Sequence, residues 1–117
     1  MKPSHSLLNA FVDEQKQLEA DGYFAVLLHQ DGIIMAANEK MSEITGYGLD
    51  EMLGMNVWAM HAPESLAKVQ SEMFKSTDAE YESIGIKKSN EQYKAKLKIL
   101  QLMYEGESCR LAGLIAL

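Results

Sequence analysis

Residues 23–29 read Tyr-Phe-Ala-Val-Leu-Leu-His, a run that is apolar on both faces of an extended strand. Such a strand must be covered on both sides, whereas a half-exposed strand alternates apolar and polar residues. Any fold of this chain therefore has to place one packed layer above this strand and another below it.

A predicted amphipathic helix precedes this strand. Its apolar residues recur at helical spacing among charged ones, and Asp21-Gly22 follows as a stop signal. We expect residues 1–21 to form a flanking helix that covers the outer face of a sheet or pairs with a second copy of the chain. The apolar residues of this helix are Leu7, Leu8, Phe11 and Leu18.

The next part of the chain predicts a hairpin followed by helices. Asp31-Gly32 is typical of a turn, and residues 33–36 form the second strand of the expected hairpin. Short helices are predicted at residues 39–45 and 49–53, each closed by a glycine that can adopt the left-handed cap conformation. Pro63 suits the first turn of a longer helix.

From residue 81 the pattern predicts strands. Residues 81–88, 92–104 and 108–117 are separated by polar turns and should form an antiparallel meander. In the middle strand the apolar positions change from odd to even numbers at Leu100, which implies a bulge or burial on both faces. The predicted fold class is α+β, with a five-stranded antiparallel sheet, short helices and one longer helix on one face, and an N-terminal helix. The helices and the inner sheet face should enclose a small apolar cavity.

Composition narrows the function classes. The 117 residues suit one domain, and the net charge of -6 argues against a nucleic-acid partner, because such partners are bound through Lys and Arg. Cys109 is the sole cysteine, so one chain has no disulfide and no Cys-based zinc site, as expected in the cytoplasm. The apolar runs of the chain are too short to span a bilayer, so we expect no membrane contact by this segment. No catalytic or metal-binding motif appears, and we expect no enzymatic activity.

The first half of the chain carries three spaced motifs, Asp31-Gly32-Ile33-Ile34-Met35-Ala36-Ala37-Asn38, Ile44-Thr45-Gly46-Tyr47 and Glu51-Met52-Leu53-Gly54-Met55-Asn56. These motifs resemble those of a PAS domain. The second half carries Ala62-Pro63-Glu64-Ser65, residues 81–88 and Tyr104-Glu105-Gly106, which resemble a subgroup found in bacterial histidine kinases and diguanylate cyclases. We assign residues 22–117 to the PAS domain and expect the chain to be a piece that stops inside the final strand. One departure is the turn Lys88-Ser89-Asn90-Glu91, which lacks the family's usual glycine and should be looser or of a different type.

The resemblance implies a sensory input domain for signal transduction, as in two-component systems. Such a domain binds a small ligand in its core and relays a conformational change to an output domain, here a histidine kinase or diguanylate cyclase. Because the flanking helix could pair with a second copy of the chain, we also expect a homodimer. Two alternatives are an interaction or dimerisation module without a ligand and a flavin-binding redox sensor. The predicted ligand pocket comprises Met35, Asn38, Met41, Trp58, Met60, His61, Met73, Phe74 and Ile86.

The ligand and any cofactor are left unassigned by the sequence, and a domain without a prosthetic group is our first expectation. Family members with a cysteinyl-flavin carry a cysteine after the E-x-L-G segment, where this chain has Val57. Haem-binding members use a histidine on the longer helix, and residues 63–77 contain none, although His61 lies just before them. A noncovalent flavin needs no cysteine and could contact Trp58 and Phe74, which are otherwise simply core aromatics. Asn38 could hydrogen-bond a flavin or cap the first short helix.

Overall fold

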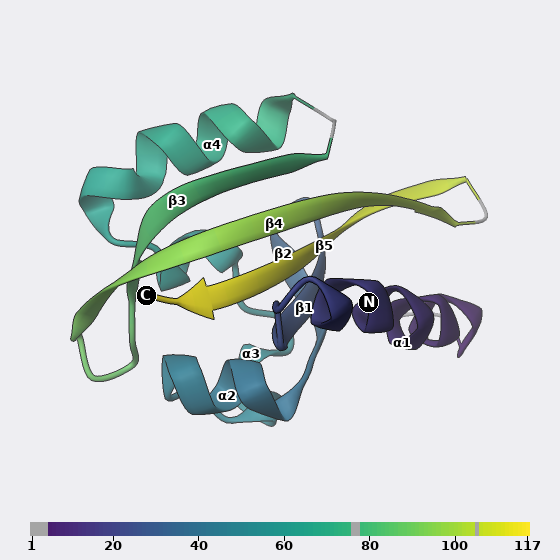
Figure 1. Cartoon of the computed structure of the whole chain (residues 1–117), viewed down its shortest axis with the longest axis horizontal. Coiled ribbons are helices and arrows are strands. Elements are labelled where there is room, and N and C mark those ends of the chain that lie inside the picture. Colours follow the sequence, from purple (N-terminus) through teal and green to yellow (C-terminus); the bar gives the residue numbers. More distant parts are fainter. Residues whose placement is uncertain (1–4, 76–77, 105) are drawn as a thin grey trace.

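One antiparallel sheet of five strands organises the described chain, with the spatial order β2-β1-β5-β4-β3 (Figure 1). The computed structural model describes residues 5–75, 78–104 and 106–117, without the side chains of residues 5–8, 73, 74, 104 and 107. The strands are β1 Ala25–Gln30, β2 Ile33–Ala37, β3 Ala79–Ile86, β4 Gln92–Tyr104 and β5 Glu107–Ala116. The α-helices are α1 His5–Ala20, α2 Glu39–Thr45, α3 Leu49–Met52 and α4 Leu66–Phe74, and the 3₁₀-helices are η1 Val57–Met60 and η2 Pro63–Ser65.

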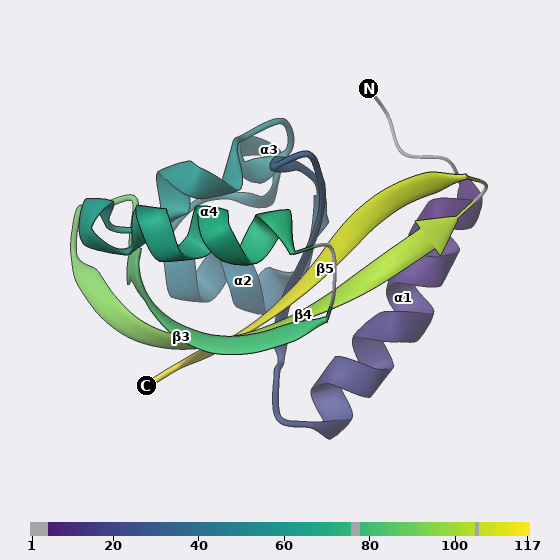
Figure 2. The same cartoon turned by 90° about the horizontal axis from the view of Figure 1, so that it is seen from above.

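The helices form two separate layers. Helices α2, α3 and α4 lie on one face of the sheet, called the inner face here, and α1 lies on the opposite, outer face (Figure 2). Each face has its own cluster of buried apolar residues, one with Leu27 and Ile34, the other with Val26 and Leu28. The predicted α+β architecture is confirmed, and β1 is covered on both sides as its sequence requires.

Helix α1 packs its apolar stripe against the outer face of its own sheet. Phe11 is 6% exposed and Leu18 is fully buried, in a cluster that includes Cys109 and Leu111 of β5. Gly113 of β5 permits this close approach, because a Cβ atom there would lie 3.3 Å from the Cδ1 of Leu18 on α1 and 2.8 Å from the Cβ of Tyr23. We expected this apolar stripe either to cover the outer face of the sheet or to pair with a second copy of the chain. Phe11 and Leu18 cover the sheet. The side chains of Leu7 and Leu8 fall outside the described part.

In β4 the apolar positions change from odd to even numbers because helix α1 covers only part of the outer face of this strand. Over the described residues, β4 pairs with both neighbours without a register shift, so the predicted bulge is absent from this pairing. Lys94, Lys96 and Lys98 occupy the outer face where solvent reaches it, and Leu100 and Leu102 occupy the same face within the α1 cluster. Burial on both faces was therefore the correct alternative for this part of the strand.

A bulge does occur between β1 and β2. Leu28 is opposite Ala36 and His29 is opposite Ile34, which leaves Met35 without a partner in β1. The extra residue interrupts the alternation of faces, because Met35 and Ala36 both pack in the outer cluster.

Asn90 supplies the left-handed residue of the turn between β3 and β4. Its φ is 73°, its N–H donates to the Lys87 carbonyl at 2.8 Å, and the Lys87 N–H donates to the Glu91 carbonyl at 2.9 Å. Of the two expected alternatives, a looser turn and a turn of a different type, the structure does not show the looser one, because asparagine tolerates the left-handed conformation that glycine usually provides.

Local differences from the sequence-based expectations are small. The η1 helix was not predicted, and the third strand begins at Ala79 rather than at residue 81. Gly46 caps α2 in the left-handed conformation at φ 81°, as predicted. In the part of the chain that the structure describes, no helix combines the length and apolar character needed to cross a membrane.

Replacing Leu18 by alanine should lower the free energy of unfolding by about 2–5 kcal/mol, because a fully buried leucine leaves a cavity between α1 and the sheet. Val12 on the same helix is 52% exposed, so Val12→Ala serves as the control and should change it by less than about 0.5 kcal/mol. Urea unfolding measures both, and sedimentation shows whether either variant changes the oligomeric state. Equal, small effects of the two substitutions would contradict the packing of α1 on its own sheet.

Asn90→Ala should destabilise the domain by about 1 kcal/mol, because an alanine at φ 73° pays the steric cost of the left-handed region. Asn90→Gly should be close to neutral, since glycine adopts this conformation freely. Ser89→Ala, at the exposed neighbouring position, removes the hydroxyl that accepts from the Glu91 N–H at 3.4 Å and measures separately what side-chain hydrogen bonding contributes to this turn. If Asn90→Ala and Asn90→Gly unfold at the same urea concentration, the backbone of this turn is not what Asn90 contributes.

Candidate functional site

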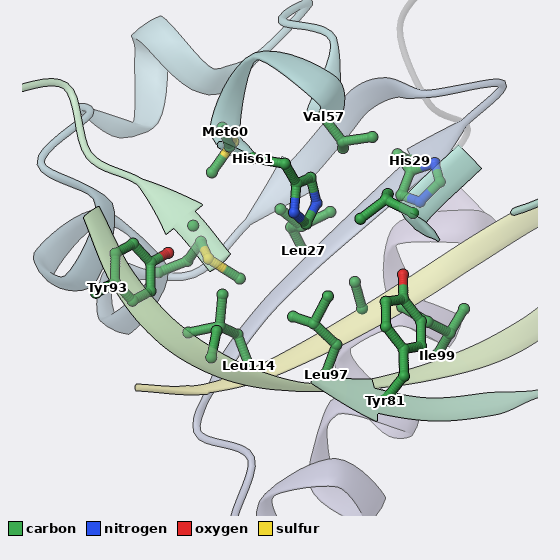
Figure 3. Close-up of a pocket in the computed structure, with 15 residues that line it drawn as sticks. Leu27, His29, Val57, Met60, His61, Tyr81, Tyr93, Leu97, Ile99 and Leu114 are labelled. Atoms are coloured by element: carbon green, nitrogen blue, oxygen red, sulfur yellow. The ribbon is translucent and has the colours of Figure 1, made fainter. Parts of the chain in front are cut away.

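A cavity lies between the inner face of the sheet and the helices that cover it (Figure 3). The centre of a water molecule can reach about 50 Å³ of it. Since one water needs about 10–15 Å³ of cavity volume, the cavity has room for about three to five water-sized groups. Its lining residues are Leu27, His29, Met41, Val57, Met60, His61, Val69, Tyr81, Gly85, Tyr93, Ala95, Leu97, Ile99, Ala112 and Leu114.

Small residues on the sheet leave this space open. Gly85, Ala95 and Ala112 line the cavity from β3, β4 and β5, and all three face the inner layer. Met41 from α2 and Met60 from η1 also line it, and a methionine side chain adapts its shape easily. The floor of the cavity is therefore set by small residues of the strands, and two of the covering side chains are adaptable methionines.

His29 is the buried polar residue of β1. It is 4% exposed, and its Nδ1 atom has no hydrogen-bond partner among the described residues. Burial lowers the pKa of His29 to about 4, and the positive charge of Arg110 acts in the same direction. Arg110 lies directly opposite His29 on β5. The imidazole is therefore neutral at pH 7, with one nitrogen acting as a donor and the other as an acceptor.

His61 enters the cavity from the covering side. Its backbone forms a bridge to Gly85, and the next residue, Ala62, donates its N–H to the Ile84 carbonyl at 2.9 Å. These contacts hold the segment after η1 against β3. The Nδ1 atom of His61 lies 3.1 Å from the Ser83 hydroxyl, and burial lowers the pKa of His61 to about 4. A second neutral imidazole therefore joins His29 in the cavity wall.

Two tyrosines approach from the sheet. Figure 3 shows the Tyr81 hydroxyl pointing from β3 toward the side of the cavity that holds His29 and His61. Burial raises the pKa of Tyr81 and of Tyr93 to about 12, so both hydroxyls stay protonated at neutral pH. The Tyr93 ring lies across Gly85, where an added Cβ would be 2.5 Å from its Cζ atom. The wall thus combines an apolar surface with four neutral hydrogen-bonding side chains.

Of the predicted pocket residues, the structure brings Met41, Met60 and His61 together in the cavity wall. Met35 is a correction, because the bulge in β2 turns it toward the outer cluster beneath α1. Trp58 packs against the inner core cluster, and neither Trp58 nor Ile86 is among the described residues that line the cavity. The predicted pocket residues whose side chains lie outside the described part are Met73 and Phe74.

Asn38 acts as a helix cap, the second of its two expected roles. Its Oδ1 atom accepts hydrogen bonds from the N–H groups of Met41 at 3.1 Å and Val26 at 3.0 Å. Its Nδ2 atom donates to the Phe24 carbonyl at 2.8 Å. The side chain therefore ties α2 to the start of β1 and points its polar atoms at the backbone.

Sequence reasoning missed three polar residues of the wall: His29, Tyr81 and Tyr93. Strand parity could have found Tyr93, because it shares odd numbering with Ala95, Leu97 and Ile99.

The cavity in its present shape does not fit a flavin or a haem. Pockets for drug-sized molecules enclose about 300–1,000 Å³, well above the free space here. Cys109 belongs to the outer cluster beneath α1, so it lies on the face of the sheet away from the cavity and cannot bond a ligand held there. Within the described ranges, no group of three or more His, Cys, Asp or Glu side chains could hold a metal ion.

Comparison with known proteins identifies the fold. The sequence model of a PAS domain matches residues 20–115. No curated protein matches the chain.

Solved structures of PAS domains resemble this one. A PAS domain from a two-component sensor histidine kinase is 12% identical, with a TM-score of 0.72, over 88% of this chain and 100% of that one. The PAS domain of an HTR-like protein from Haloarcula marismortui is 18% identical, with a TM-score of 0.70, over 97% of this chain and 100% of that one. A light-oxygen-voltage domain studied with a flavin analogue is 19% identical, with a TM-score of 0.72, over 87% and 82%.

At these identities the structural likeness shows the fold alone, and the sequence match extends through nearly all of the sheet and its inner helices. In this structure the three motifs lie in the β1–β2 hairpin, at the end and cap of α2, and at the end of α3. The protein belongs to the PAS domain family.

Proposed function

We propose that this domain is a sensory module that binds a small molecule in the inner cavity. The observation that carries the proposal is the cavity itself, whose wall combines an apolar surface with four neutral hydrogen-bonding side chains. A molecule bound there would bury apolar surface and could form hydrogen bonds with these side chains, which stabilises the folded state. The proposed activity is binding rather than catalysis.

Strand β5 is the proposed route by which occupancy reaches other domains. It lies between β1 and β4, and Ala112 and Leu114 line the cavity on its inner face. On its outer face Leu111 and Ile115 pack in the α1 cluster. A displacement of β5 by a ligand would therefore reach both α1 and the end of the sheet near Leu117. The proposed recipients are a histidine kinase or diguanylate cyclase output domain, in a cytoplasmic protein that acts as a homodimer.

The second candidate is a ligand-free interaction module. The small size of the cavity favours it, because 50 Å³ is also suitable for a few water molecules. A flavin sensor requires the cavity walls to rearrange. The three candidates differ in what the purified domain carries and in what stabilises it.

The domain purified from cells should be colourless between 300 and 600 nm and should release a small organic molecule on denaturation, detected by mass spectrometry. Adding that molecule to protein freed of it should raise the melting temperature in proportion to the logarithm of its concentration. A flavin or Soret absorption band would replace this proposal by a redox or gas sensor. A domain that releases nothing and is stabilised by no compound of a metabolite library would support the ligand-free module.

The two neutral histidines predict a pH dependence of stability. Their folded pKa values of about 4 lie below the ordinary value of 6.5, so between these limits the unfolded chain binds protons that the native state does not. The free energy of unfolding should therefore be nearly constant above about pH 7.5, begin to fall near pH 6.5 and fall further toward pH 4, by up to about 1.4 kcal/mol per pH unit for each histidine. Urea unfolding at pH 7.5, 6.5 and 5.5 measures the slope.

His29→Leu is the control for this measurement, because it removes one of the two groups and should halve the slope between pH 6.5 and 5.5. An unchanged slope in that variant would show that His29 is not a neutral group in the folded state.

A further inference from the structure

The wall of the inner cavity is built from uncharged groups. Within the part of the chain that the structure describes, the lining includes no Asp, Glu, Lys or Arg. Its polar groups are distributed rather than gathered, and Figure 3 shows the hydroxyls of Tyr81 and Tyr93 on different sides of the cavity. A molecule held there therefore meets hydroxyl and imidazole groups but no counter-charge in the lining.

Three cations stand close to this wall without lining it, two beside the rings of lining tyrosines and one beside a lining histidine. Each has an oxygen partner of its own. Lys68 donates to the Glu82 carbonyl at 2.7 Å, and the Nζ atom of Lys87 lies 3.9 Å from a carboxylate oxygen of Glu91. Arg110 donates to a carbonyl of α4 at 3.4 Å. These interactions keep the charges outside the space that a ligand would occupy.

The lining side chains that could carry a charge are held neutral. Burial lowers the pKa of His29 and of His61 to about 4 and raises the pKa of Tyr81 and of Tyr93 to about 12. Because pH 7 is three units above a pKa of about 4, roughly one His61 side chain in a thousand carries a proton there. The wall thus opposes a positive charge on its histidines and a negative charge on its tyrosines. An ionic group of a ligand would meet the same loss of hydration.

We propose that the inner cavity selects its ligand by charge, and that it admits a small uncharged molecule in preference to an anion or a cation of the same shape. This inference rests on the proposed sensory function and names the class of its ligand. The ligand can be polar, because a phenol hydroxyl or a neutral imidazole both donates and accepts hydrogen bonds. A carboxylate or an ammonium group would lose its hydration without an oppositely charged partner in the lining.

The test titrates three molecules of nearly the same shape into the purified domain at pH 7 and follows its methyl NMR signals. Propionamide is uncharged, propionate is its anionic analogue, and propionamidinium is its cationic analogue. Propionamide should shift the signals of Leu27, Leu97 and Ile99, which line the cavity, with a saturable isotherm. Each ion should bind at least about tenfold more weakly, because it must leave its hydration shell to enter.

Ala112→Val enlarges a side chain of the cavity floor on β5 and should weaken propionamide binding by about fivefold or more, because it fills part of the free space. Ala116→Val makes the same change at an exposed position of the same strand, outside the lining, and should leave the affinity unchanged. If Ala112→Val fails to fold, the comparison of the three probes in the unchanged protein decides. An unaltered affinity in a folded Ala112→Val variant overturns the inference.

Binding of either ion at these methyl groups as tightly as propionamide overturns the inference. The absence of saturable shifts with all three probes also overturns it, because the cavity then does not admit an uncharged molecule of suitable size. An ionic molecule released from the purified domain overturns the charge selection and leaves the proposed sensory function standing. Release of nothing, with no stabilising compound in a metabolite library, contradicts that function instead.

Discussion

The burial of the central strands on both faces is the constraint on which the rest of the structure depends. In β1, Val26 and Leu28 pack beneath α1, and Ala25 and Leu27 pack beneath the inner helices. Strand β5 pairs with β1 from Ala25 to His29. The side chains of β5 are divided between the same two clusters. Because such strands expose apolar surface on whichever side lacks a cover, the flanking helix is as much a part of the fold as the inner helices are.

This double burial also explains the character of the cavity. A position on β1 that faces inward is dry, so the imidazole of His29 loses its hydration and is held neutral. The space beside it exists because three neighbouring strands present glycine or alanine there, where larger residues would complete a solid core. A chain with leucine at Ala95 and Ala112 would keep the same clusters and fill this space.

The sequence predicted well the features that depend on local pattern and less well those that depend on pairing. The order of elements, the stripe of α1 and the cap of α2 follow from nearby residues, so they could be read directly. Met35 was misplaced because a bulge is a property of two paired strands, and neither strand alone reveals it. Tyr81 was missed for a similar reason, since only the register of β3 against β4 shows that it faces inward. The role of Asn90 was not predicted because asparagine, like glycine, can adopt positive φ, so the missing glycine did not indicate a loose turn.

Gly85 and Tyr93 face each other across β3 and β4, and the ring occupies the volume that any side chain at position 85 would need. The two positions are therefore not free to vary independently. A larger residue at 85 is compatible with this sheet only when the residue at 93 becomes smaller, and the exchange would move bulk from one wall of the cavity to another. Related sequences should show this pair changing together, so that the shape of the cavity is inherited through two coupled positions on neighbouring strands.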